Sequence, residues 1–159
     1  MPTAVVLGGI NGAGKTTASR ALLADQLALM CFVNADAIAR GLNDFAPETA
    51  AIQAGRVMLA QLKELSQARR DFAFETTLSG RAYIAFLREL RASGYAAEVY
   101  YFWLGSTELA VNRVRMRVAA GGHDIPVETI RQRYGKSLSN FWTDYRMAAD
   151  AWYVYDNSG

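Results

Sequence analysis

One short glycine-rich segment constrains this sequence more than any other feature. Residues Gly9 to Thr16 read Gly-Ile-Asn-Gly-Ala-Gly-Lys-Thr and match the spacing G-x-x-x-x-G-K-[S/T]. The segment follows an apolar run, Ala4 to Leu7, typical of a buried strand, and it leads into a helical pattern over residues 15–27. A glycine-rich turn between a strand and a helix offers backbone N–H groups and a positive helix end to an anion. The pattern therefore predicts a phosphate-binding loop (P-loop).

The positions of the P-loop have individual expected roles. The glycines let the backbone curl around a phosphate, Lys15 reaches the β- and γ-phosphates, and the Thr16 hydroxyl can bind Mg²⁺. ATP or GTP, together with Mg²⁺, is therefore the expected ligand set. The predicted nucleotide-binding residues are Gly9, Asn11, Gly12, Ala13, Gly14, Lys15, Thr16 and Thr17.

The rest of the chain alternates short apolar runs with helical patterns. Further strands are expected at Cys31–Val33, Phe72–Phe74, Glu98–Leu104 and Trp152–Tyr155. Helices are expected at Ala50–Gln67, Arg81–Ala92 and Ser106–Val118, with two more helical stretches before the last strand. This alternation predicts a single α/β domain over residues 1–159, with a three-layer P-loop NTPase fold. Its parallel sheet should have about five strands, with helices on both faces.

Composition excludes several classes of protein. The 17 basic and 15 acidic residues give a net charge of +2, which indicates no clear nucleic-acid-binding surface. One cysteine, Cys31, and one histidine, His123, leave no disulfide framework and no multi-histidine metal site. No apolar run is long enough for a membrane span, and the N-terminus lacks the pattern of a signal peptide. A soluble cytoplasmic protein is expected.

An acidic residue follows the second predicted strand, at the end where open α/β sheets place their ligands. Asp36 comes directly after Asn34-Ala35 and is a candidate general base for a substrate hydroxyl. The alternative is a cap for the next helix, and both roles can coexist. Arg40, one turn later, is placed to contact a substrate phosphate or to pair with Asp36.

Glu75 ends the third predicted strand within Phe-Glu-Thr-Thr-Leu-Ser-Gly, residues 74–80, where most positions are polar or glycine. We expect it to bind substrate hydroxyls or to hold Mg²⁺ through water, with a structural ion pair as the alternative. Further candidates for substrate binding are Thr76, Thr77, Ser79 and Arg81.

A basic segment, residues 105–136, follows the fourth predicted strand and holds six basic residues against three acidic ones. Arg113 and Arg117 are four positions apart and therefore share a helix face. This pair, together with the break that follows at Gly121-Gly122, predicts that residues 105–136 form a small helical lid that closes over a triphosphate. A solvated helix face is the alternative. His123 is either a lid contact or a loop residue packed on its neighbours.

These motifs together resemble the zeta-toxin family of P-loop kinases, in particular its small bacterial members. The resemblance covers almost the whole chain and rests on Gly9–Thr17, Phe32–Asp36, Phe72–Gly80, Gly121–Pro126 and Tyr155–Ser158. It implies an adenylate-kinase-like core and a kinase that phosphorylates a small molecule, which in zeta toxins proper is UDP-N-acetylglucosamine.

The resemblance also implies roles for single residues. Lys15 is then the P-loop lysine, Asp36 the general base and Glu75 the glutamate that binds substrate. The first lid arginine is Arg113. No antitoxin partner can be inferred.

Three departures from the family pattern are visible. The family usually has Glu-Gly-Thr where residues 75–77 read Glu-Thr-Thr, a departure at the substrate site that leaves open whether the substrate is the family's sugar nucleotide. The second lid arginine of the family falls at or near His123, so its role passes to His123, Arg117 or one of Arg131 and Arg133. Relatives usually continue beyond the strand that corresponds to the last predicted strand of this chain. The resemblance implies that a final helix follows this strand in the family.

The expected function is that of an ATP- and Mg²⁺-dependent kinase that transfers the γ-phosphoryl group to a hydroxyl of a small molecule, such as a nucleotide sugar. The predicted catalytic residues are Lys15, Asp36, Arg113 and Arg117. Two alternatives remain open: a nucleoside or polynucleotide 5′-hydroxyl kinase, and a regulatory P-loop ATPase that is not a kinase.

Overall fold

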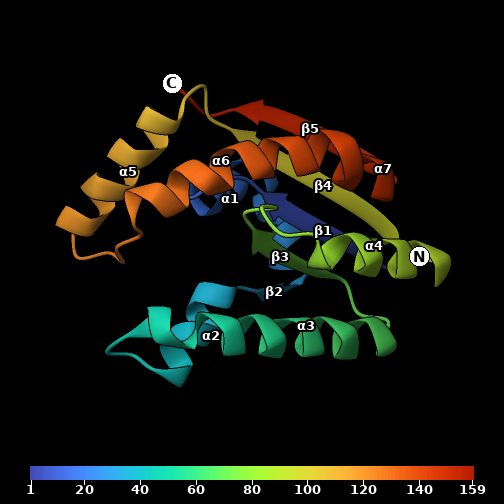
Figure 1. Ribbon diagram of the computed structural model, residues 1–159. Coiled ribbons are helices and arrows are strands. Elements are labelled where there is room, and N and C mark those ends of the chain that lie inside the picture. The colour runs from blue at the N-terminus through green and yellow to red at the C-terminus, as the bar shows by residue number, and fades with distance from the viewer.

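Five parallel strands form one sheet in the order β2-β3-β1-β4-β5 (Figure 1). The computed structural model describes the backbone of residues 1–159 and every side chain except that of Glu48. The strands are β1 (Thr3–Gly8), β2 (Cys31–Val33), β3 (Phe72–Thr76), β4 (Ala96–Trp103) and β5 (Ala151–Asp156). All four pairings are parallel, which confirms the predicted five-stranded parallel sheet.

The helices occupy the segments between the strands. They are α1 (Lys15–Ala28), α2 (Ala35–Leu42), α3 (Ala51–Gln67), α4 (Ala82–Ala92), α5 (Thr107–Ala119), α6 (Val127–Asn140) and α7 (Arg146–Ala148). A 3₁₀ turn, η1 (Pro47–Ala50), leads into α3, and a π-helical turn, η2 (Phe141–Tyr145), joins α6 to α7. Among the described residues, no helix combines the length and the apolar character that a membrane crossing needs.

The two faces of the sheet carry separate hydrophobic cores. Alternate strand residues point to opposite faces, so Ala4 and Val6 of β1 join one core while Val5 and Leu7 join the other. The first core lies under α3, α4 and the segment from η2 to α7, and the second lies under α1, α5 and α6. Helices therefore cover both faces, as the three-layer α/β fold requires.

The carboxyl ends of the strands meet at one edge of the sheet. Gly8 at the end of β1 is in register with Thr76 of β3 and Tyr101 of β4. The P-loop therefore lies between the segments that follow both neighbouring strands. The strand register thus gathers the predicted site residues at the edge where parallel sheets bind ligands.

The segment before the last strand contains the two expected helical stretches, α6 and α7, joined by the π-helical turn η2. The helical backbone continues without a break from α6 through η2 into α7. The backbone N–H of Arg146 donates to the carbonyl oxygen of Phe141, five residues earlier, which is the spacing of a π-helix.

Candidate active site

The P-loop connects β1 to α1 in a conformation that needs glycine. Gly12 has a φ of +82° and Gly14 a φ of +74°, both in the left-handed region. A Cβ on Gly12 would lie 2.8 Å from the carbonyl oxygen of Ala110 in α5, and one on Gly14 would lie 2.7 Å from Nδ2 of Asn157. The loop therefore lies tightly between α5 and the chain after β5. Left-handed residues before a helix form a concave site for an anion.

Asn157 holds the P-loop from the far end of the sequence. Its Nδ2 donates to the carbonyl oxygen of Ala13 at 2.6 Å, and its backbone N–H donates to the carbonyl oxygen of Trp103 at 2.8 Å. Sequence reasoning assigned no role to Asn157. Its position directly after the last parallel strand, where ligand-site residues gather, is the signal that could have found it.

Lys15 begins α1, and its ammonium group lies within the P-loop. Its Nζ donates to the carbonyl oxygens of Gly9 at 2.8 Å and Ile10 at 3.3 Å. Carbonyl oxygens compensate a partly buried cation less well than an anion does. The lysine is therefore poised to exchange these partners for phosphate oxygens.

The electrostatic surroundings of Lys15 come from both sides of the site. Burial lowers its pKa from 10.5 to about 8. The carboxylates of Glu75 and Asp36 act to raise this pKa, while the nearby cations Arg117 and Arg133 lower it further. These five side chains therefore form one interacting group of charges.

Glu75 at the end of β3 lies beside the start of α1. Its Oε1 accepts a hydrogen bond from the Thr16 hydroxyl at 2.5 Å, and its Oε2 accepts one from Nδ2 of Asn34 at 3.3 Å. Both partners are neutral, and Glu75 forms no ion pair with any described cation. The Glu75 carboxylate is therefore hydrogen-bonded to the hydroxyl of the P-loop residue Thr16. The structure does not support the alternative of a structural ion pair.

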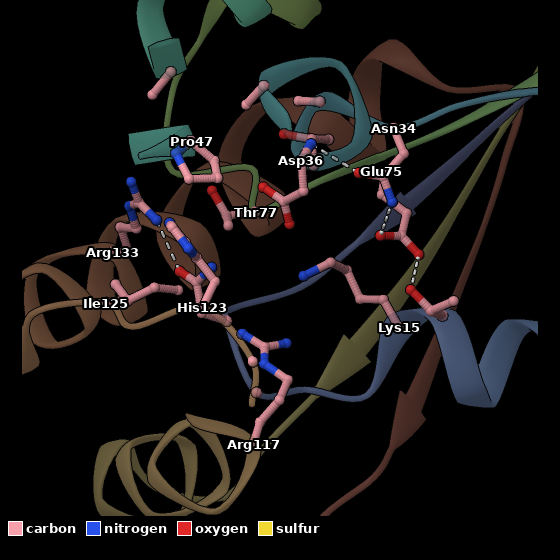
Figure 2. A pocket seen from close by; sticks show the side chains of 18 of the residues that line it. Lys15, Asn34, Asp36, Pro47, Glu75, Thr77, Arg117, His123, Ile125 and Arg133 are labelled. Carbon is pink, nitrogen blue, oxygen red and sulfur yellow. Dashed lines mark hydrogen bonds between the residues drawn. The ribbon is translucent and has the colours of Figure 1, made fainter. Parts of the chain in front are cut away.

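Asn34, and not Asp36, caps α2. Oδ1 of Asn34 accepts hydrogen bonds from the backbone N–H groups of Asp36 at 2.8 Å and Ala37 at 3.4 Å. The capping alternative for Asp36 is therefore wrong. Its carboxylate points into the pocket toward Lys15, as Figure 2 shows. Arg40, one turn later on α2, lines the same pocket.

The two arginines predicted to share a face of α5 both line the pocket. Arg117 extends from α5 toward Lys15 in Figure 2. Arg113 lies one turn earlier, where its Nη2 donates to the carbonyl oxygen of Gly159 at 3.4 Å. His123, in the loop between α5 and α6, lines the pocket as well.

Helix α6 adds a third arginine to this group. Nη1 of Arg133 donates to Oδ1 of Asn11 in the P-loop at 3.0 Å. Arg131 instead faces α5, where its Nη1 lies 3.7 Å from Oε1 of Glu108. Residues two positions apart on a helix point to different sides. Of these two candidates for the second lid arginine, the structure thus brings Arg133 to the P-loop.

A single cavity of about 890 Å³ joins these groups. Its polar lining, called the polar end below, comes from the P-loop, Asp36, Arg113, Arg117 and Arg133. Thr76, Thr77 and Ser79 line the cavity from the loop after β3. The other end is mostly apolar and is lined by Ala39, Pro47, Ala51, Ala54, Met58 and Tyr83. These apolar residues, from α2, η1, α3 and α4, were not among the residues predicted from the sequence.

Arg81 is a correction to the predicted substrate-binding set. Its Nη1 lies 2.6 Å from Oδ2 of Asp144, in an ion pair outside the cavity lining. This pair raises the pKa of Arg81 and lowers that of Asp144. The partner lies in η2, 63 positions later in the sequence, so no local pattern could reveal it.

The residues present fit a nucleotide with Mg²⁺. The P-loop glycines leave no room for a Cβ, and Lys15 supplies the cation for the phosphates. The Thr16 hydroxyl and the Glu75 carboxylate are the oxygen donors that Mg²⁺ prefers. No cluster of three or more metal-binding side chains exists among the described residues. Most ligands of a bound Mg²⁺ would therefore be water and phosphate oxygens, as is usual for this ion.

Comparison with known families decides how to interpret this site. A sequence model of the zeta toxin family matches residues 1–159. The chain belongs to the zeta toxin family. This assignment confirms the predicted resemblance and makes the protein a P-loop kinase, and such kinases in general use a nucleotide and Mg²⁺. It also sets aside the alternative of a regulatory ATPase.

Individual proteins resemble this chain in sequence or in fold. An uncharacterized protein of Haemophilus influenzae is 29% identical over 126 residues, which are 79% of this chain and 88% of the relative. A solved structure from the PezAT chromosomal toxin–antitoxin system of Streptococcus pneumoniae has a TM-score of 0.75 at 17% identity, covering 98% of this chain and 68% of that one. Shikimate kinase of Acinetobacter baumannii has a TM-score of 0.58 at 22% identity, covering 96% and 83%. The two structural likenesses show the shared fold.

Proposed function

We propose that this zeta toxin family member transfers the γ-phosphoryl group of ATP to a hydroxyl group of a small, anionic acceptor of the nucleotide-sugar class. In this step the hydroxyl oxygen forms a bond to the γ-phosphorus, the bond from that phosphorus to the β–γ bridging oxygen breaks, and ADP leaves. The hydroxyl proton passes to a carboxylate of the protein. Such a reaction depends mainly on positioning and on stabilisation of charge.

The polar end of the cavity is the proposed nucleotide site. The P-loop amides and Lys15 would bind the β- and γ-phosphates, and Thr16 with Glu75 would hold Mg²⁺, which neutralises phosphate charge when bound. Arg113, Arg117 and Arg133 surround the same end from α5 and α6. Their cationic groups would stabilise the charge that spreads over the transferred group.

Asp36 is the proposed general base. Asn34 caps α2, so the Asp36 side chain has no capping role, and its carboxylate points into the cavity toward Lys15 (Figure 2). A carboxylate in that position can accept the proton of an acceptor hydroxyl while the oxygen approaches the phosphorus. One cavity that is lined by the P-loop, by Asp36 and by the apolar residues of α2, η1, α3 and α4 is the observation that carries this proposal.

The apolar end of the cavity is the proposed acceptor site. Small side chains such as Ala39 and Ala54 would leave room there for a ring, and Tyr83 adds an aromatic side chain to the lining. Arg40 adds a cation to the cavity lining, and Thr77 adds a hydroxyl group. A flat ring, several hydroxyls and a negative charge are features of a nucleotide sugar, and family membership supports the same class.

Transfer of label from [γ-³²P]ATP tests the proposal. With Mg²⁺ and UDP-N-acetylglucosamine, the protein is expected to form a labelled sugar nucleotide, and Lys15→Ala protein is expected to form none. Parallel reactions with ribonucleosides and with a 5′-hydroxyl oligonucleotide test the alternative of a nucleoside or polynucleotide 5′-hydroxyl kinase. Label in those products, and none in the sugar nucleotide, would contradict the proposed acceptor class.

A further inference from the structure

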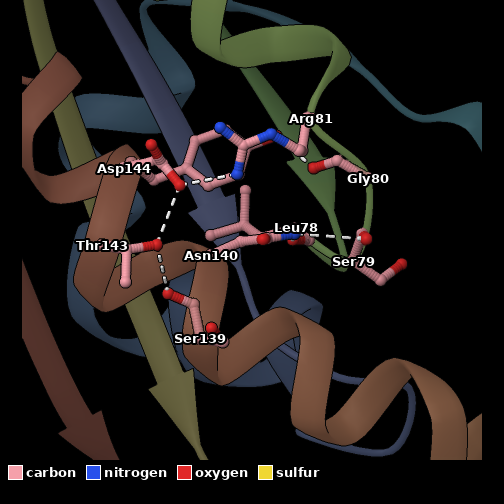
Figure 3. A network of polar contacts seen from close by, with 9 residues as sticks. Leu78, Ser79, Gly80, Arg81, Ser139, Asn140, Thr143 and Asp144 are labelled. Carbon is pink, nitrogen blue, oxygen red and sulfur yellow. Dashed lines mark hydrogen bonds and ion pairs between the residues drawn. The ribbon is translucent and has the colours of Figure 1, made fainter.

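A row of side-chain donors on α6 and η2 holds the loop after β3. The carbonyl oxygens of residues 77–80 accept hydrogen bonds, one after another, from this helical segment. Ser137 Oγ donates to residue 77 at 2.5 Å, and Tyr145 Oη donates to residue 80 at 2.6 Å. Between them, Nδ2 of Asn140 donates to residues 78 and 79 at 2.9 and 3.2 Å (Figure 3). The backbone of the loop is thus fixed by side chains about 60 positions away in sequence.

The π-helical turn η2 brings these donors into line. Residues three or four apart share a face of an α-helix, whereas Asn140 and Tyr145 are five apart and both reach the loop. The five-residue spacing is that of the π-helix that connects them. Asp144, in the same turn, holds Arg81 at the end of the loop (Figure 3). The π-helical turn therefore lets side chains five positions apart bind neighbouring carbonyl groups of the loop.

Leu78 shows that the loop is held in an unfavourable conformation. Its φ of +58° lies in the left-handed region, which a branched side chain rarely adopts. The side chain is fully buried, and a Cβ on Gly8 would lie 2.5 Å from its Cδ1. Such a conformation persists where the surroundings fix it. Here the core against Gly8 and the paired hydrogen bonds of Asn140 supply that constraint.

The loop carries two hydroxyl groups into the cavity. Oγ1 of Thr77 and Oγ of Ser79 lie 2.7 Å apart, and both residues line the cavity. The conformation of Leu78, between them, sets how the two hydroxyls are presented. Their position therefore depends on the hydrogen bonds that Asn140 makes.

We propose that Asn140 is a positioning residue for the phosphoryl acceptor. Through the carbonyl oxygens of Leu78 and Ser79, it holds the Thr77 and Ser79 hydroxyls where the acceptor binds. The inference rests on the proposed function, which puts the acceptor in this cavity. Asn140 lies outside the cavity lining, so it acts through the loop and not by direct contact.

Two variants and one control test this role. Asn140→Ala removes both donors, and Tyr145→Phe removes a single hydroxyl while it keeps the buried ring. Ser139→Ala changes the exposed neighbour of Asn140 and leaves every bond to the loop in place. Hydrogen exchange of the Leu78 and Ser79 amides is measured without ligand. The KM for UDP-N-acetylglucosamine and the Kd for a non-hydrolysable ATP analogue are then measured on the full chain.

We expect changes only in the hydrogen exchange of the loop amides and in the kinetics with the acceptor. In both variants the loop amides should exchange about tenfold faster, and the acceptor KM should rise about tenfold more than kcat falls. The Kd for the ATP analogue should stay within twofold, and the control should match the wild-type protein. Unchanged loop exchange, equally faster exchange across the whole chain, or an unchanged acceptor KM would overturn the inference. If the wild-type protein transfers nothing to UDP-N-acetylglucosamine, the proposed acceptor is wrong, and the exchange comparison alone decides whether Asn140 holds the loop.

Discussion

Asn157 donates its side-chain amide to the carbonyl oxygen of Ala13 at 2.6 Å, across 144 positions of sequence. The bond ties the end of the edge strand β5 to the P-loop, next to the left-handed Gly14 that caps the start of α1. The conformation of the phosphate-binding loop therefore depends on the last described residues of the chain as well as on its own glycines.

Replacing Asn157 tests this dependence. Asn157→Ala should weaken the binding of an ATP analogue about fivefold, because one hydrogen bond contributes about 1 kcal/mol. Calorimetric titration measures the change. Ser158→Ala is the matched control, since Ser158 accepts from the backbone N–H of Gly105 and makes no bond to the P-loop. Equal effects of the two variants would show that the C-terminal segment, and not the Asn157 bond, supports the loop.

The lowered pKa of Lys15 predicts how nucleotide binding varies with pH. The free protein loses the Lys15 proton above pH 8, whereas phosphate favours the protonated form. Affinity for an ATP analogue should therefore be constant just below pH 8 and fall by up to about tenfold per pH unit above it. Titration in two buffers of different ionisation enthalpy should show proton uptake in that range.

Two further observations check the assignment to Lys15. Lys15→Arg keeps its charge throughout, so its affinity should not fall above pH 8. The free energy of unfolding should also respond, because the unfolded chain binds the proton more tightly than the folded one between pH 8 and pH 10.5. Stability of the nucleotide-free protein should then rise with pH over that interval. A pH-independent affinity in the wild-type protein would show that Lys15 keeps its ordinary pKa.

Glu75 is expected to act on Mg²⁺ through its contact with Thr16. Glu75→Gln keeps an acceptor for the Thr16 hydroxyl but removes the charge. The Mg²⁺ concentration for half-maximal turnover should rise about tenfold, because a carboxylate binds Mg²⁺ far better than an amide. Titration of activity with Mg²⁺ at saturating ATP measures this. An unchanged Mg²⁺ requirement with a raised acceptor KM would assign Glu75 to the acceptor instead.

The lid arginines are expected to act mainly on the transition state. Arg113→Ala should lower kcat about a hundredfold and change ATP-analogue affinity much less, because the charge on the transferred group grows during the reaction. Arg115→Ala is the control, since Arg115 belongs to the same helix but does not line the cavity. Hydrogen exchange of residues 111–126 should slow when the analogue binds. Equal exchange with and without the analogue would show that this segment does not close.

Much of the fold follows from local patterns in the sequence. Buried strands read as short apolar runs, and the P-loop spacing with its strand and helix fixes the nucleotide end of the site. Because parallel strands end at one edge, Asp36 and Glu75 could be assigned to that edge without knowledge of the strand order.

The contacts that local patterns missed join distant segments. Arg81 pairs with Asp144, and Asn157 reaches Ala13, and neither partner is marked by sequence spacing. Asn34 took the capping position expected for Asp36, because a shift of two residues decides which side chain meets the free helix amides. Likewise, Arg133 and Arg131 are only two positions apart on α6, but Arg133 faces the P-loop and Arg131 faces α5. The π-helical turn η2, which contacts the β3–α4 loop through Tyr145, was not predicted by any local pattern either.

The rate of phosphoryl transfer by Asp36→Asn protein tests the central claim most directly. The variant keeps the shape of residue 36 and the Asn34 cap, so ATP-analogue affinity and melting temperature should match those of the wild-type protein. Transfer of label from [γ-³²P]ATP to UDP-N-acetylglucosamine should fall at least tenfold, since a general base contributes about 10²–10⁴-fold. An unchanged transfer rate, or a loss of nucleotide binding or of folding in place of a loss of transfer, would contradict the role of Asp36 as the base.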